Sequence, residues 1–169
     1  MFRGSPNIID VEASGFGSYS YPIEIGVILD NGDRYCSLIA PAADWDFWDD
    51  GAESVHRISR EILRKHGKPL KVVATELNAF LSGQVVYSDG WVVDSPWVSQ
   101  LFYTAHTRQD FKVSSLEMIL TEPQMEIWHE TKEALLLNSE HKRHRASFDA
   151  VLIQETFVKT AELTQGACV

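Results

Sequence analysis

Two acidic residues interrupt the first strongly apolar stretch of this chain, and this feature constrains the fold more than any other. Residues 8–15 read Ile-Ile-Asp-Val-Glu-Ala-Ser-Gly. The β-branched residues favour a strand, whose side chains alternate between two faces, so Asp10 and Glu12 point the same way, roughly 7 Å apart along the backbone. Like charges so placed repel each other. Either the strand shows these acids to solvent at a sheet edge, or a divalent cation with oxygen ligands lies between them.

The rest of the chain predicts an α/β fold in which helices pack on a mixed sheet. The sequence Asn31-Gly32 between two apolar runs is typical of a hairpin, and Ser59 is an expected helix cap. No regular pattern covers residues 41–53. The expected strands are residues 7–13, 22–29, 34–40, 84–88 and 112–114, and the expected helices are 59–66, 70–81, 96–105, 123–137 and 146–163.

Length and charge limit the classes of protein that this chain can be. We expect residues 1–169 to form one domain, without internal repeats or linkers. The absence of a long apolar segment and of an apolar signal region predicts a cytoplasmic protein with no membrane partner. A net charge of −9 argues against a protein that coats long duplexes. The basic residues form two groups, one of Arg57, Arg60, Arg64, Lys65, Lys68 and Lys71 and one of Lys142, Arg143 and Arg145.

Asp149 and His144 have chemical reasons to join the two acids of the first strand. Asp149 shares a helix face with the apolar residues three and four positions later, so its carboxylate points inward, as a metal ligand or as an acid at the edge of the apolar stripe. On one continuous helix His144 would lie about 140° away from Asp149. If the helix begins near residue 146, His144 is free to reach the same site, where an imidazole can take a proton from water at neutral pH.

Asp94 and Asp89 compete for the place of a further acid. Asp94 precedes Ser-Pro-Trp and would also serve as a helix cap, while Asp89 ends the fourth expected strand. Their spacing does not choose between them. The aromatic residues Trp45, Phe47 and Trp48 leave two possibilities open, stacking on single-stranded bases or packing under a loop.

Taken in order, these segments resemble the DEDDh exonucleases, the DnaQ-like branch of the ribonuclease H-like superfamily, which includes polymerase proofreading subunits and ribonuclease T. The resemblance spans about residues 7–163. Two positions depart from the family pattern: Arg57 stands where glycine is usual, and Ser88-Asp89-Gly90 replaces the common His-Asn. The matching segments are residues 9–16 with 23–27, residues 55–59, Asp94 with Trp97, and residues 144–150.

The resemblance implies a ribonuclease H-like mixed five-stranded sheet flanked by helices. It also implies a 3'-5' exonuclease that releases 5'-mononucleotides from single-stranded DNA or RNA, and prefers Asp94 to Asp89. The alternative is a proofreading or RNA-processing subunit that mainly docks on a partner complex. A homodimer is common among such enzymes. Two Mg²⁺ or Mn²⁺ ions would be held by Asp10, Glu12, Asp94 and Asp149.

The same resemblance assigns roles around the reacting phosphate. His144 would be the base that takes a proton from the attacking water. The side chain of Glu12 and the backbone near Ala13 would meet the terminal 3'-hydroxyl. Phe16 would stack against the final bases unless it packs on the sheet as an ordinary loop aromatic. The expected lining of the same pocket is completed by His56 and Ile58.

Overall fold

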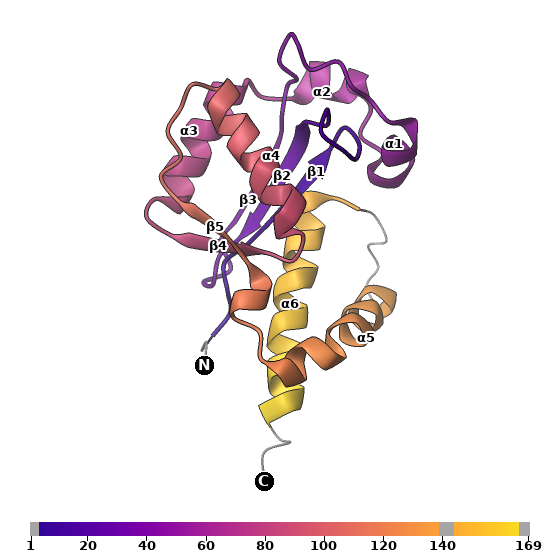
Figure 1. The fold of residues 1–169 in the computed structure, drawn as a ribbon, viewed down its shortest axis with the longest axis vertical. Coiled ribbons are helices and arrows are strands. Elements are labelled where there is room, and N and C mark those ends of the chain that lie inside the picture. Colours follow the sequence, from indigo (N-terminus) through magenta and orange to yellow (C-terminus); the bar gives the residue numbers. More distant parts are fainter. Residues whose placement is uncertain (1–3, 139–143, 166–169) are drawn as a thin grey trace.

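The computed structural model describes residues 4–138 and 144–165, and within them five strands form one mixed sheet in the order β3-β2-β1-β4-β5 (Figure 1). The three strands on one side are antiparallel neighbours, whereas β4 and β5 run parallel to β1. This confirms the expected mixed five-stranded sheet. The strands are β1 (Ile8–Ala13), β2 (Pro22–Ile28), β3 (Arg34–Leu38), β4 (Val85–Ser88) and β5 (Lys112–Ser115).

Helices cover both faces of this sheet. The helices α3 and α4 pack on one face and α6 packs on the other, where α5 lies against it (Figure 1). None of the described helices is long and apolar enough to cross a membrane. The helices are α1 (Asp50–His56), α2 (Arg60–His66), α3 (Leu70–Leu81), α4 (Trp91–Thr104), α5 (Glu122–Asn138) and α6 (Ala146–Gln165), with a short 3₁₀ turn at Leu116–Met118.

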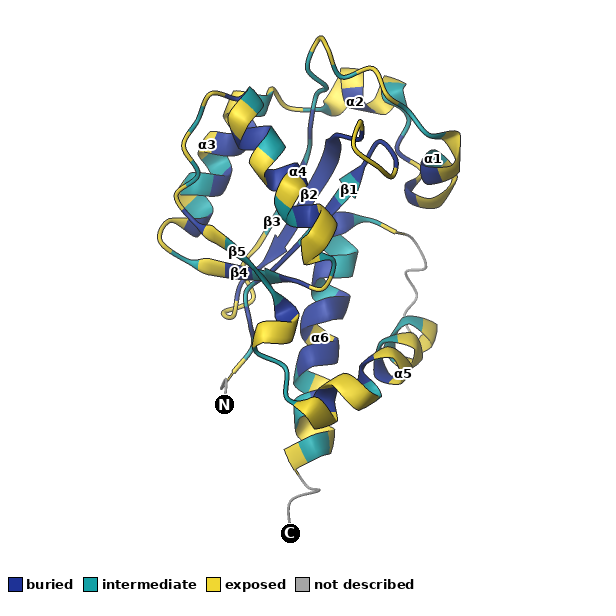
Figure 2. Ribbon diagram, in the orientation of Figure 1, coloured by how far each residue is buried: buried dark blue, intermediate teal, exposed yellow. Residues whose placement is uncertain are grey.

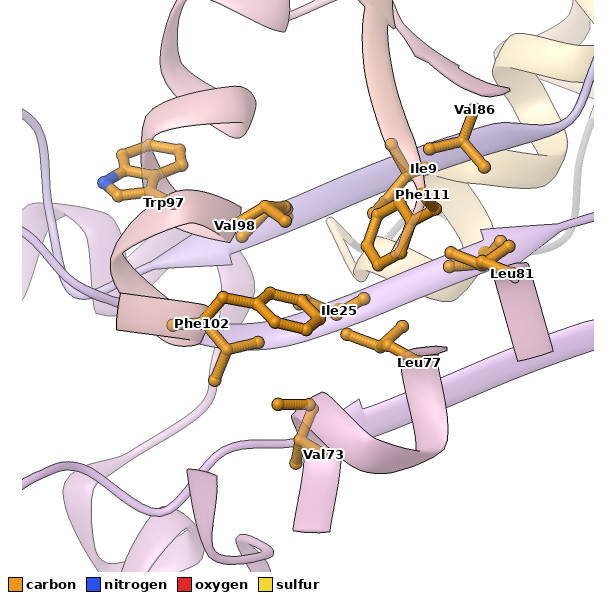
Figure 3. Close-up of a cluster of buried hydrophobic side chains, with 14 of the residues drawn as sticks. Ile9, Ile25, Val73, Leu77, Leu81, Val86, Trp97, Val98, Phe102 and Phe111 are labelled. Atoms are coloured by element: carbon orange, nitrogen blue, oxygen red, sulfur yellow. The ribbon is translucent and has the colours of Figure 1, made fainter. Parts of the chain in front are cut away.

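Alternation along β1 decides which side chains each helical layer receives. Ile9 and Val11 point into the cluster formed with α3 and α4, which Figure 3 shows in close-up. Ile8 points to the opposite face, where it packs with residues of α6 that are buried along the sheet side of that helix (Figure 2). Because Asp10 and Glu12 share the parity of Ile8, both carboxylates lie on the α6 side.

The local signals for turns and caps were accurate. Gly32 adopts φ +88° in the hairpin turn after β2, and Ser59 Oγ accepts a hydrogen bond from the Ile62 N–H at the start of α2. Such signals act within a few residues, so they can be recognised without knowledge of the tertiary structure.

Two expected boundaries were wrong. The region expected to be irregular up to residue 53 contains the start of α1, which Asp49 caps by accepting the Gly51 N–H at 2.7 Å. The helix expected from Pro96 begins at Trp91, and Asp94 lies in its first turn instead of capping it. Pro96 lacks the N–H that would reach the carbonyl of Val92, but Val92 is exposed, so water can take its place.

Candidate active site

Three carboxylates from two elements meet on the α6 side of the sheet. Asp10 and Glu12 project from β1, and Asp149 projects from the first turn of α6. One carboxylate oxygen from each of the three lies within 4.8 Å of the other two. All three residues are partly buried, which places their charges in a region where water screens them poorly.

Asp94 lies outside that group of three, but it lines the pocket that the three acids share. Its residue is 3% exposed, and its Oδ2 accepts a hydrogen bond from Ser88 Oγ at 2.5 Å. Asp89, the competing acid, instead binds Lys132 Nζ at 2.5 Å through its Oδ2. The tertiary structure therefore turns Asp94 toward the other acids and gives Asp89 a different partner.

A pocket of about 570 Å³ lies over the acids. His144 lines it from the segment just before α6, with its Nδ1 3.9 Å from Asp149 Oδ2 and its side chain 61% exposed. The helix begins at Ala146, so the condition for His144 and Asp149 to share a site is met. The other lining acids are Asp10, Glu12, Asp94 and Glu133.

Burial and mutual repulsion raise the pKa of every acid in this group. Burial, followed by the charges of Asp94 and Asp149, raises the pKa of Asp10 well above its ordinary value. Burial and the nearby carboxylates bring the pKa of Glu12 to about 7, and burial brings the pKa of Asp94 to about 7. Burial also raises the pKa of Asp149, against the lowering effect of His144. A cation between these groups would relieve the repulsion.

An ion pair between a buried glutamate and a partly exposed arginine fixes the segment that carries His144. Glu24, which pairs with Glu12 across the β1–β2 ladder, is 0% exposed. Both of its carboxylate oxygens accept from Arg145 Nε at 3.0 Å, Arg145 Nη2 donates to one of them, and the Ala146 N–H donates to the other at 3.0 Å. The carboxylate of Glu24 thus accepts from a backbone N–H at the start of α6 and balances the positive charge of Arg145, the residue after His144.

Gly26 allows α6 to approach this closely. It lies two residues after Glu24 on the same face of β2, and a Cβ added there would lie 2.2 Å from the carbonyl carbon of Ala146. Two residues of β2 therefore position the start of α6: Glu24 binds it, and Gly26 leaves room for its backbone. The neighbouring basic residues Lys142 and Arg143 lie outside the described residues.

The predicted substrate-contact residues have different surroundings. Ala13, Phe16 and His56 all line the pocket, and the 78% exposure of Phe16 excludes packing on the sheet. Ile58 does not line it: its side chain is 1% exposed in an apolar cluster with Leu63, which corrects the expectation of a pocket position. Instead its backbone N–H donates to His56 Nδ1 at 3.0 Å.

This hydrogen bond determines the protonation state of His56. Nδ1 accepts a hydrogen bond, and burial lowers the pKa of the ring, so the neutral imidazole carries its proton on Nε2. Nε2 is buried and has no hydrogen-bond partner among the described residues. His56 therefore presents an unused N–H donor at the pocket wall.

Two of the three aromatic residues before α1, Trp45 and Trp48, pack within the loop, whereas Phe47 is 37% exposed. Trp45 stacks on Tyr21 with ring centroids 5.1 Å apart, and Trp48 meets His56 edge to face at 6.2 Å. Arg60 lies 5.4 Å above the Trp48 ring. Trp48 thereby supports the wall that carries His56.

Arg57 has a backbone conformation that glycine adopts more readily than arginine. It ends α1 with φ 56° and ψ 32°, the left-handed conformation that an L side chain disfavours. The conformation turns the chain from His56 toward α2 within a few residues.

Sequence reasoning missed the wall that α5 contributes. His129, Lys132, Glu133 and Leu136 line the pocket from one side of this helix, at the spacing of three and four residues that marks a helix face. That spacing is visible in the sequence, but nothing local tells which face meets a pocket formed by β1 and α6.

No protein-family model matches the sequence, and no curated protein matches it either. Solved structures of exonuclease I do match. The zinc-bound complex of E. coli exonuclease I with single-stranded DNA has a TM-score of 0.66 at 14% sequence identity, over 99% of this chain and 41% of that chain. An apo structure of exonuclease I has a TM-score of 0.66 at 16% sequence identity, over 94% of this chain and 42% of that chain.

These comparisons confirm the ribonuclease H-like fold that the sequence motifs implied. The chain spans about two fifths of the length of the exonuclease I chains that it matches.

Proposed function

We propose that this chain is a metal-dependent 3'-5' exonuclease that releases 5'-mononucleotides from single-stranded nucleic acid. The observation that carries the proposal is that four acids from β1, α4 and α6 meet the imidazole that precedes α6 in a single pocket. The fold shared with exonuclease I supports the same conclusion, and its single-stranded DNA complex makes DNA the first substrate to test. The residues that meet are Asp10, Glu12, Asp94, Asp149 and His144.

The donor set fits hard divalent cations. Carboxylate oxygens are the ligands that Mg²⁺ and Mn²⁺ prefer, and three of them already lie within 4.8 Å of one another. When bound, two such ions would activate a water and stabilise the leaving 3' oxygen. The four acids would hold these ions, since all four line the pocket.

The remaining pocket residues would bind and orient the end of the strand. His144 takes the proton of the attacking water, since its imidazole is exposed to the pocket and lies beside Asp149. Phe16 stacks against the last base, and His56 Nε2 donates a hydrogen bond to the bound nucleotide. Glu12 and the backbone of Ala13 meet the terminal 3'-hydroxyl.

Incubation with 5'-labelled single-stranded DNA and RNA, in Mn²⁺ or in chelator, tests the proposal. We expect metal-dependent shortening from the 3' end that is lost in Asp10→Ala and reduced about 10²–10⁴-fold in His144→Ala. His66→Ala, which replaces an exposed histidine of α2 outside the pocket, is the matched control and should retain wild-type activity. Equal activity in all variants would reveal a contaminating nuclease, and inactivity on every oligonucleotide would favour the docking role.

A further inference from the structure

Lys132 is the one lysine or arginine among the described residues that line the pocket. Every acid of the candidate site lines the same pocket, and Glu133 adds another carboxylate from α5. A phosphodiester is itself an anion, so its approach to this wall requires positive charge. Metal ions held by the four acids would supply part of that charge. Lys132 adds positive charge from α5, near enough to Asp94 and Asp149 to favour their charged forms.

The packing of α5 aims Lys132 at the pocket. Trp128 and Thr131 are buried on one side of the helix, and Trp128 packs in the cluster formed with α6. His129 and Lys132, separated by three residues, line the pocket together with Leu136. The direction of the side chain thus follows from the face that α5 buries, and does not depend on the ion pair alone.

The ion pair with Asp89 holds the ammonium group in place and leaves it able to bind a second anion. Lys132 Nζ lies 2.5 Å from Asp89 Oδ2, with the two side chains 31% and 22% exposed. Asp89 follows β4 directly and lies five residues before Asp94. Because an ammonium group has three donors and this contact uses one, the other two remain for oxygen atoms of a ligand.

Resting on the function proposed above, we propose that Lys132 binds a phosphate group of the single strand in the pocket. Asp89 orients the ammonium group, and the strand passes between α5 and the acids of β1 and α6. This makes α5 a substrate-binding wall in addition to the residues that match the family motifs. The competing explanation is that the pair only fastens α5 to the end of β4.

Equilibrium binding of a fluorescein-labelled oligothymidylate, followed by anisotropy at increasing salt with Ca²⁺ as the metal, separates these explanations. A single phosphate contact contributes about 0.7 to the slope of log K against log salt for single strands. We expect Lys132→Met to bind about tenfold more weakly and to lose that much of the slope. Asp89→Asn breaks the same ion pair but keeps the ammonium group, so it should retain the wild-type slope.

Two results would overturn this inference while the proposed nuclease stands. One is a wild-type slope in Lys132→Met. The other is an equal loss of affinity and slope in Lys132→Met and Asp89→Asn, which indicates a fastening role. A wild-type protein that neither binds nor shortens any single strand would instead refute the proposed function and this inference together.

Discussion

Replacing Gly26 by alanine should displace the start of α6 and with it His144 and Asp149. The added Cβ would lie 2.2 Å from the carbonyl carbon of Ala146, whereas ordinary contact begins near 3.4 Å. The backbone of β2 or of α6 must therefore move by about 1.2 Å. Overpacking of this kind costs about 1–3 kcal/mol of stability, and a misplacement of about 1 Å at a reacting centre can cost about 10²-fold in rate.

The assay compares the melting temperature with kcat on a single-stranded oligonucleotide, measured well below the melting temperature. Gly32→Ala is the matched control. Gly32 lies in the turn that follows β2, away from α6, and its φ of +88° makes the substitution destabilising there. We expect both variants to melt earlier, but only Gly26→Ala to lose about 10²-fold in kcat. A Gly26→Ala protein with wild-type melting and wild-type kcat would refute the docking role of Gly26. Equal kcat in both variants would show that the close approach of α6 to Gly26 does not control the positions of His144 and Asp149.

Three further predictions concern charge and backbone strain. The pKa of Glu12 and of Asp94 is raised to about 7 in the folded chain. Between about pH 5 and pH 7 the folded chain therefore holds protons that the unfolded chain has already released. The melting temperature of the metal-free protein should therefore fall as the pH rises from about 5 to about 8, and Mg²⁺ should restore it; a rise over this range would contradict the assignment. In the absence of metal, Asp10→Asn should be more stable than the wild type by about 1 kcal/mol in urea unfolding, because it removes a repelled charge, and a destabilised variant would show that the acids do not repel. Arg57→Gly should raise the melting temperature by about 2–4 °C through relief of the left-handed conformation, while Arg57→Ala should leave it unchanged.

Much of the sheet and part of the site follow from patterns within a few residues. The alternation within residues 7–13 predicts a strand with Asp10 and Glu12 on one face, and β1 spans Ile8–Ala13. The apolar spacing at the C-terminus predicts a helix from residue 146, which frees His144 to share a pocket with Asp149. Periodicity reports the face that an element buries, because backbone geometry alone sets the direction of each side chain.

Other parts of the site depend on contacts between distant segments. The spacing of Asp89 and Asp94 left their surroundings open, and only the fold shows that α5 brings Lys132 to Asp89, across 43 positions of sequence. Glu24 meets Arg145 across 121 positions, and no local pattern marks either residue as a partner of the other. Such pairs form only when the packing of helices on the sheet brings their elements together.

The sequence by itself predicted which residues would carry the proposed chemistry, and it determined which face each of them takes on its own element. The tertiary structure decided how the elements meet: α6 approaches β2 closely over Gly26, Glu24 holds the segment of His144, and α5 forms the opposite wall. The physical reason is that side-chain direction is a local property of the backbone, whereas the distance between two elements depends on the packing of the whole core.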